Sequence, residues 1–161
     1  MIGRNNPVIH TMVGHYVSGP KVIDVLLVED TPDDYEIARH VLEDEHIRYH
    51  HVRDGEEAIK FVFSSLQGLE PLPNGIHLIL LDLKLPKLDG LEVLKKIRND
   101  KRTHNIPVVM LSSTDDSREI AEAYDLGANS FVIKPIEFEK FVKMLSTIFL
   151  YWMQVNENSV R

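Results

Sequence analysis

Polar side chains follow four of the apolar runs in this sequence, at the point where each run ends. They are three acids, one serine and one lysine: Glu29, Asp30, Asp82, Ser112 and Lys134. Carboxylates that lie close together repel one another, and a divalent cation relieves that repulsion. Carboxylate oxygens that leave positions open for water and phosphate suit Mg²⁺ better than zinc. If the runs are parallel strands, these residues predict a Mg²⁺ site at one edge of a sheet.

The same residues could transfer a phosphoryl group. A carboxylate can act as a nucleophile toward phosphorus and form an aspartyl phosphate. Asp82 is the best candidate, because it follows the apolar run at 77–81, which should be a buried central strand. The charge that develops on the phosphoryl oxygens then needs a metal, a positive group and a hydrogen-bond donor. The Lys134 ammonium and the Ser112 hydroxyl could supply the last two.

Each of these residues also has an ordinary explanation when it is taken alone. Acids and serines at strand ends often cap helices or face solvent, and a lysine before a proline is most often a surface residue. Independent surface residues, however, need not all follow the carboxyl ends of strands. Their shared position therefore favours one joint site.

The elements that must position this site alternate along the chain. Strands are predicted at 22–28, 49–52, 77–81, 107–111 and 130–133, the second of them at a sheet edge. Helices are predicted after the caps Thr31 and Asp54, around 91–97, over 117–126 with Gly127 as the stop, and over 137–153. This alternation predicts an α/β fold with a doubly wound, five-stranded parallel sheet. The ligand site of such a sheet lies beyond the carboxyl ends of its strands.

Length and composition indicate one soluble domain. The chain has 161 residues, 43% of them hydrophobic, no cysteine and a net charge of −7. The acidic balance argues against sequence-independent binding to nucleic acid, and no apolar run reaches the length of a membrane span. We predict a flexible tail at 1–21, a domain at 22–153 and a C-terminal tail at 154–161, in a cytoplasmic protein.

Four segments of the chain resemble the receiver domains of two-component response regulators. They are VLLVED at 25–30, LDLKLPKLDG at 81–90, PVVMLSS at 107–113 and FVIKP at 131–135. The segments occur in the family's order and with its separations, and the resemblance covers about 22–152. It implies a flavodoxin-like sheet with strand order 2-1-3-4-5 and five helices.

By this resemblance, Asp82 would be the phosphoacceptor and a metal ligand. Asp30 would bind Mg²⁺ directly, Glu29 would help through water, and the backbone carbonyl of Lys84 would be a further ligand. The chain would be a phosphorylation switch that reacts with small phosphoryl donors and dephosphorylates itself, and not an enzyme acting on a separate substrate.

The resemblance also implies how the switch moves. Ser112 would contact the phosphoryl group and move on activation, and Phe131 would change its rotamer with it. Lys134 would pair with a phosphoryl oxygen, and its peptide bond to Pro135 would be cis. Ser112 stands where threonine is commoner in the family, and Phe131 where tyrosine is frequent.

The partners implied are a sensor histidine kinase and a downstream protein that the sequence does not identify. The loop at 68–75 and the aromatic helix end at 149–152 are similar to those of small regulators paired with phytochrome-type kinases. An aspartyl-nucleophile phosphatase is a competing interpretation, but such enzymes typically carry a second aspartate where this chain has Lys84. A degenerate receiver that is never phosphorylated is a third, and the intact Asp30, Asp82, Ser112 and Lys134 argue against it.

The histidines and the last helix yield two further expectations. His50 and His51 are adjacent, so on a strand they should point to opposite faces, and neither they nor the other histidines have metal-ligand spacing. The last helix carries a core stripe of Phe138, Phe141, Val142, Leu145, Phe149 and Trp152. Met144, Ile148 and Tyr151 form part of a second stripe, and one helix on one sheet face should not bury both stripes fully, which favours a two-fold homodimer. The alternatives are that the tail at 1–20 covers this patch, that the helix is deeply buried, or that a partner protein binds there.

Overall fold

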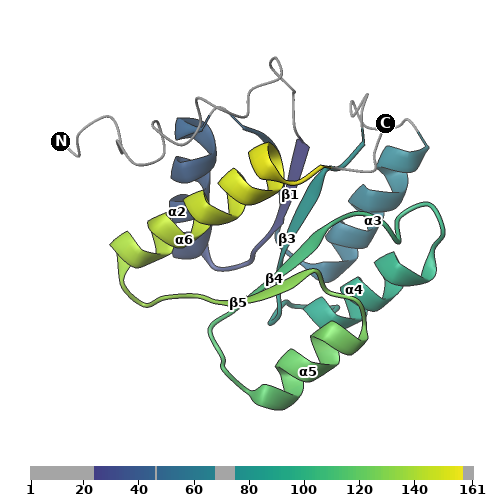
Figure 1. Ribbon diagram of the computed structural model, residues 1–161. Coiled ribbons are helices and arrows are strands. Elements are labelled where there is room, and N and C mark those ends of the chain that lie inside the picture. Colours follow the sequence, from purple (N-terminus) through teal and green to yellow (C-terminus); the bar gives the residue numbers. More distant parts are fainter. Residues whose placement is uncertain (1–23, 46, 68–74, 158–161) are drawn as a thin grey trace.

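The computed structural model describes residues 24–45, 47–67 and 75–157. The strands are β1 (Asp24–Val28), β2 (Arg48–Val52), β3 (Leu78–Asp82), β4 (Val108–Ser112) and β5 (Ser130–Ile133). They form one parallel sheet in the order β2-β1-β3-β4-β5, so the predicted order is confirmed (Figure 1). The predicted tail at 1–21, most of the loop at 68–75 and the last four residues of the predicted C-terminal tail lie outside the described residues.

Helices cover both faces of this sheet. They are α2 (Pro32–Asp44), α3 (Gly55–Leu66), α4 (Gly90–Asn99), α5 (Ser117–Asp125) and α6 (Phe138–Leu150), which continues into the π-helical turn η1 (Tyr151–Val155). Figure 1 shows α2 and α6 on one side of the sheet and α3, α4 and α5 on the other. None of the helices in the described ranges is long and apolar enough to cross a membrane.

The central strands are apolar on both faces because both faces are covered. All five residues of β1, β3 and β4 are buried. Along β1, Leu26 and Val28 belong to the core under α3, α4 and α5, whereas Val25 and Leu27 belong to the core under α2 and α6. This alternation is the two-residue period of a strand, and it explains why these segments are continuous apolar runs.

The buried acid at the start of β1 is neutralised by its neighbour on β2. Asp24 is paired in register with Arg48, whose Nη2 lies 2.5 Å from Asp24 Oδ2 and whose Nε bonds the other carboxylate oxygen. A buried carboxylate needs such a partner, and a guanidinium matches its two oxygens. Asp24 therefore interrupts the apolar run without interrupting the strand.

The two adjacent histidines of β2 lie on opposite faces, as predicted. The ring of His51 stacks on Tyr35 of α2, with the ring centroids 3.8 Å apart. The ring of His50 lies 4.9 Å from that of Phe61 of α3. Within the described residues, neither histidine belongs to a group that could hold a metal ion.

The predicted ends of three helices can be compared with the structure. Asp54 caps α3, because its Oδ1 accepts the N–H of Glu57 at 2.8 Å, and Gly127 ends α5 with a φ of +94°. Thr31 occupies the cap position of α2, but its side chain makes no capping hydrogen bond, so that prediction was wrong in part. The N–H of Thr31 instead donates to the carboxylate of Glu29 at 3.0 Å, which draws this turn toward the acidic site.

The predicted faces of the last helix need a correction. Phe138 is 49% exposed although it was placed in the core stripe, and Ile148 is buried although it was placed in the second stripe. The buried face of α6 is Phe141, Leu145, Ile148 and Phe149, which follows the helical period. Phe138 shares that period, but it is the first residue of the helix and lies one turn before the buried part begins. Met144 and Trp152 pack against the core and are half-buried.

Candidate functional site

The three predicted acids lie together at the carboxyl edge of the sheet. Glu29 and Asp30 follow β1, and Asp82 ends the neighbouring strand β3. One carboxylate oxygen from each acid lies within 4.8 Å of those of the other two. Glu29 and Asp82 are buried and Asp30 is exposed, so the group meets solvent on the side of Asp30.

The ammonium of Lys134 reaches this group from β5. Its Nζ lies 2.5 Å from Glu29 Oε2 and 3.0 Å from Asp82 Oδ2, and it also lies 2.9 Å from Asp34 Oδ2. The backbone of Lys134 is held as well, because its N–H donates to the carbonyl of Ser112 at 2.7 Å. Of these partners, only Asp34 was not predicted. The available signal was Pro32, which starts α2 and so places Asp34 in the first helical turn after Asp30.

Burial and charge act against each other at this ion cluster. Burial raises the pKa of Glu29 to about 7, although the Lys134 ammonium attracts its charged form. Burial alone would lower the pKa of Lys134, but the charges and hydrogen bonds of the surrounding carboxylates outweigh it and raise that pKa above 10.5. Lys134 is therefore a buried, permanently charged ammonium at neutral pH.

Ser112 lies on the strand next to Asp82. Asp82 is paired with Leu111 in the β3–β4 register, and Ser112 is the next residue of β4. The side chain of Ser112 is buried, and its Oγ accepts the N–H of Thr114 at 3.1 Å. A hydroxyl that accepts this bond still has its own proton to donate.

Phe131 lies away from the carboxylates, in the middle of the edge strand β5. It is half-buried against the core formed with α3, α4 and α5, and it is paired with Met110. Its N–H donates to the hydroxyl oxygen of Tyr124 on α5 at 3.1 Å. It therefore contacts α5 and the core on that face of the sheet, and it is not among the hydrogen-bonded partners of the charged cluster.

The loop after Asp82 approaches the acid with its backbone. Lys84 is exposed, and its N–H donates to Asp82 Oδ1 at 3.3 Å. The Lys84 ammonium pairs with Glu119 of α5. Its side chain therefore points to α5, which leaves only its backbone as a candidate contributor to the site.

The peptide bond between Lys134 and Pro135 is trans, so the expected cis bond is not found. Trans is the favoured isomer of such a bond by about 0.5–1 kcal/mol. From this isomer the Lys134 side chain already reaches Glu29 and Asp82.

The donor set fits a hard divalent cation. Three clustered carboxylates carry more negative charge than Lys134 neutralises, and oxygen ligands are the ones that such cations prefer. Among the described residues, no cysteine or histidine belongs to this group of candidate ligands, and the neighbouring His51 ring contacts the backbone carbonyl of Glu29 instead. Zinc would favour cysteine or histidine ligands.

A comparison with protein-family models identifies the family. The model of the response regulator receiver domain matches residues 25–146. This chain belongs to the response-regulator receiver family. The match begins at the second residue of β1, covers the other four strands and ends within α6, so it includes every residue of the charged cluster.

Individual relatives of this receiver domain agree with the assignment. The response regulator Rcp1 of Synechocystis sp. is 36% identical over 140 residues, which cover 84% of this chain and 90% of Rcp1. The crystal structure of the phosphorylated cyanobacterial phytochrome response regulator RcpA matches with a TM-score of 0.80 and 30% identity, over 86% of this chain and 99% of RcpA. The Mn²⁺-bound form of Rcp1 matches with a TM-score of 0.78 and 30% identity, over 84% of this chain and 98% of that one.

Proposed function

We propose that this chain is a stand-alone response regulator that accepts a phosphoryl group from the phosphohistidine of a sensor kinase onto Asp82. The observation that carries the proposal is the position of Asp82, whose carboxylate lies beside Glu29 and Asp30 and 3.0 Å from the Lys134 ammonium. In this step a lone pair of a carboxylate oxygen of Asp82 forms a P–O bond. The P–N bond of the phosphohistidine breaks, and its electron pair stays on the imidazole.

Mg²⁺ is the proposed physiological metal. Glu29, Asp30, Asp82 and the backbone carbonyl of Lys84 would hold it, and it would neutralise charge on the phosphoryl oxygens. Lys134 would pair with one phosphoryl oxygen, and the Ser112 hydroxyl would donate to another. The Mn²⁺-bound structure of Rcp1 supports a divalent metal in a relative of this chain.

The chain itself is proposed to be a switch and not a phosphatase acting on other molecules. The second carboxylate that such a phosphatase needs would stand at position 84, where the chain carries an exposed lysine paired with Glu119. Self-phosphorylation from small donors and self-dephosphorylation are the reactions we expect.

Incubation with acetyl phosphate and Mg²⁺ followed by intact-mass measurement tests this proposal. We expect one phosphoryl group on the wild-type chain and none on Asp82→Asn. Asp30→Ala should need a higher Mg²⁺ concentration for labelling, because it loses a direct carboxylate ligand and binds Mg²⁺ more weakly. Asp115→Asn is the matched control, because Asp115 is an exposed acid that follows β4. Phosphorylation of the Asp82→Asn chain at another residue would show that the assignment is wrong.

Ser112 and Phe131 are proposed to carry the signal to a protein-binding surface on α5, β5 and α6. A phosphoryl group adds negative charge and acceptor oxygens at the end of β3, toward which the Ser112 hydroxyl would move, and Phe131 would repack into the released space. Ser112→Ala should then accept phosphate without the change at Phe131 that the wild-type chain shows in aromatic NMR spectra. Equal spectral changes in both proteins would contradict this coupling.

A phytochrome-type histidine kinase is the proposed partner, in the cytoplasm. The support is the similarity to RcpA, a phytochrome response regulator, and to the bacteriophytochrome response regulator AtBRR at 38% identity. Phosphotransfer kinetics with purified kinases test this. If a phytochrome kinase transferred its phosphoryl group no faster than unrelated histidine kinases do, the proposed partner would be wrong.

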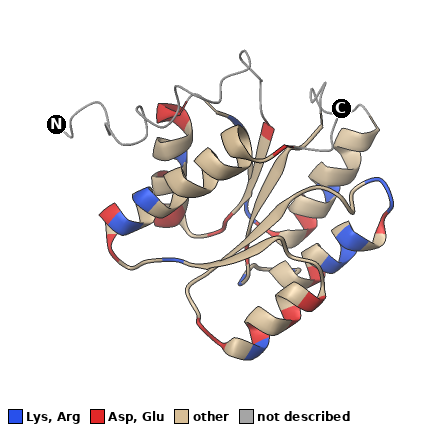
Figure 2. Cartoon of the chain, viewed as in Figure 1, with Lys and Arg blue, Asp and Glu red and all other residues tan. Residues whose placement is uncertain are grey.

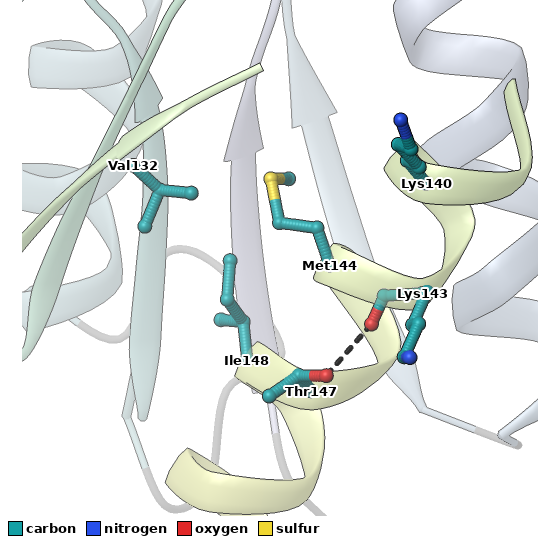
Figure 3. A pocket seen from close by; sticks show the side chains of 6 residues that line it. All are labelled: Val132, Lys140, Lys143, Met144, Thr147 and Ile148. Carbon is teal, nitrogen blue, oxygen red and sulfur yellow. Dashed lines mark hydrogen bonds between the residues drawn. The ribbon is translucent and has the colours of Figure 1, made fainter. Parts of the chain in front are cut away.

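A homodimer through α6 is the remaining proposal. A shallow groove of about 450 Å³ lies between β5 and α6, with an almost wholly apolar surface and with Lys140 and Lys143 among its lining residues (Figure 3). Ile136, two residues before α6, and Phe138, its first residue, are exposed apolar side chains. In a two-fold symmetric dimer, if residue i of one copy contacts residue j of the other, then residue j of the first copy also contacts residue i of the second. Two antiparallel α6 helices that cross near Val142 would place Ile136 of each copy at Ile148 in the groove of the other.

A further inference from the structure

Lys134 has one partner that neither the proposed metal site nor the proposed phosphoacceptor explains. Its ammonium contacts Glu29, Asp34 and Asp82 at 2.5, 2.9 and 3.0 Å. An ammonium has three protons, so these three carboxylates occupy all of its donors. Asp34 is the member of this set that is absent from the cluster of candidate metal ligands.

The three carboxylates differ in how easily each can separate from the Lys134 ammonium. The Glu29 side chain is 2% exposed and also accepts the N–H of Thr31. The Asp82 side chain is 8% exposed and would itself carry the phosphoryl group. The Asp34 side chain is 25% exposed, so water can solvate its carboxylate when the ammonium moves away. Releasing a charge to water costs far less than leaving it unpaired in a buried site.

The net charge of the cluster determines how much the release of Asp34 from Lys134 matters for phosphorylation. Three carboxylates, Glu29, Asp34 and Asp82, contact the Lys134 ammonium, and the exposed Asp30 adjoins two of them. Although burial raises the pKa of Glu29, the acids of this cluster outnumber its one ammonium, so the cluster is negative before any phosphate arrives. A phosphoryl group adds further negative charge and acceptor oxygens. For Lys134 to donate a hydrogen bond to one of those oxygens, it must give up one of the hydrogen bonds that it makes to a carboxylate in the unphosphorylated structure.

We propose that Asp34 is a positioning residue that holds Lys134 in the unphosphorylated state and competes with the phosphoryl group for its ammonium. Asp34 thus restrains phosphorylation of the site. This inference rests on the proposed function of Asp82. It assigns to the first turn of α2 a control over how readily the switch is turned on.

The test is the rate of phosphorylation of the full chain by acetyl phosphate, at a Mg²⁺ concentration that saturates each variant. Asp34→Asn should react about five- to tenfold faster than the wild-type chain, because one like charge and one competitor for Lys134 are removed. Asp34→Glu keeps the charge and should restore a rate near that of the wild type.

The matched control is Asp33→Asn. Asp33 is the preceding residue of α2, is exposed, and is not among the partners that the described residues provide for Lys134. Asp33→Asn loses the same charge as Asp34→Asn but no contact with Lys134. If the direct contact is what matters, its phosphorylation rate should stay within about twofold of that of the wild type. A rate for Asp34→Asn equal to or below that of the wild type would overturn the inference, as would equal acceleration by Asp33→Asn. A wild-type chain that takes up no phosphoryl group would instead overturn the proposed function together with it.

Discussion

At the scale of single residues, the path of the chain around Asp82 depends on a glycine. A Cβ atom at Gly90 would lie 2.3 Å from the carbonyl oxygen of Asp82 and 2.9 Å from the Cα of Leu83. Both are backbone atoms and cannot rotate away. The N–H of Gly90 also donates to the carbonyl of Leu83 at 2.9 Å. The absence of a side chain at Gly90 therefore lets the start of α4 close the loop that follows the acid.

We expect Gly90→Ala to lower the free energy of unfolding by about 1–3 kcal/mol, because the added methyl group must displace backbone. It should also slow phosphorylation of Asp82 by acetyl phosphate, since the displaced backbone belongs to that residue. Urea denaturation and intact-mass kinetics measure the two effects.

Gly127→Ala is the comparison for this variant. The φ of +94° at Gly127 also disfavours a side chain, but the nearest neighbour of an added Cβ would be the flexible side chain of Arg98. Gly127 precedes β5, so it lies near the amino ends of the strands and away from the carboxyl edge that holds Asp82. Gly127→Ala should destabilise the fold by about 1–2 kcal/mol and leave the phosphorylation rate unchanged. If Gly90→Ala behaved in the same way, close packing at Asp82 would not matter for the reaction.

At the scale of elements, the loop between β3 and α4 is tied to the start of α3. Asp54 caps α3 and also pairs with Lys87, whose Nζ lies 2.6 Å from Asp54 Oδ2. Lys87 adopts a φ of +65°, which is uncommon for a residue with a side chain. A Cβ atom at Gly55 would lie 2.0 Å from the carbonyl oxygen of Leu88. One carboxylate thus secures both a helix end and the loop beside the site.

We expect Asp54→Ala to destabilise the fold by about 1–2 kcal/mol, because the cap of α3 is lost together with the ion pair. Lys87→Met keeps the cap and should cost less, since the Lys87 side chain is 54% exposed and exposed pairs contribute little. Urea denaturation of both variants separates the cap from the pair. Equal losses in the two variants would contradict a dominant role for the cap.

The contacts of Asp54 also determine how its contribution to the stability of the fold depends on pH. The hydrogen bond from Lys87, and then that from the backbone of Glu57, lower the pKa of Asp54 below 3.8. A lowered pKa stabilises the folded chain above the unfolded value, and this contribution is lost as the pH falls through the folded value. The stability difference between the wild-type chain and Asp54→Ala should therefore shrink below about pH 4.

At the scale of the whole molecule, charge and apolar surface lie on different elements. Figure 2 shows basic residues gathered on α4 and the turn after it, whereas α5 carries mainly acids. The exposed large apolar side chains in and beside α6 are Ile133, Ile136, Phe138, Tyr151 and Val155. Ile136 and Phe138 lie at the start of α6, whose later residues line the apolar groove beside β5, and this is the surface we propose for self-association.

We expect a monomer–dimer equilibrium in analytical ultracentrifugation across a concentration series, with and without beryllofluoride as a phosphoryl mimic. Ile136→Glu should abolish the dimer, because it places a charge at the proposed apolar contact, and it should not affect folding since Ile136 is fully exposed. Leu66→Glu is the control, because Leu66 is a partly exposed apolar residue at the end of α3 on the other face of the sheet. A monomer in both states, well above micromolar concentration, would leave this surface to another protein.

The sequence by itself determined the strands, their order of appearance and the edge of the sheet at which the candidate site lies. The central strands are buried on both faces, so they must be continuous apolar runs and can be recognised without a structure. Parallel strands bring their carboxyl ends to one edge, so residues such as Asp82 and Lys134, 52 positions apart, can be assigned to one site from position alone. The resemblance to receiver domains then supplied the strand order.

Only the tertiary structure decided which side chains meet within that frame. Asp34 contacts Lys134 across 100 positions, because the first turn of α2 and the residue that follows β5 both lie at the carboxyl edge of the sheet, and no local pattern encodes that contact. The exposure of Phe138 and the burial of Ile148 depend on where along α6 the contact with the sheet begins. Helical periodicity states which residues share a face, but the neighbouring element decides how much of that face is covered.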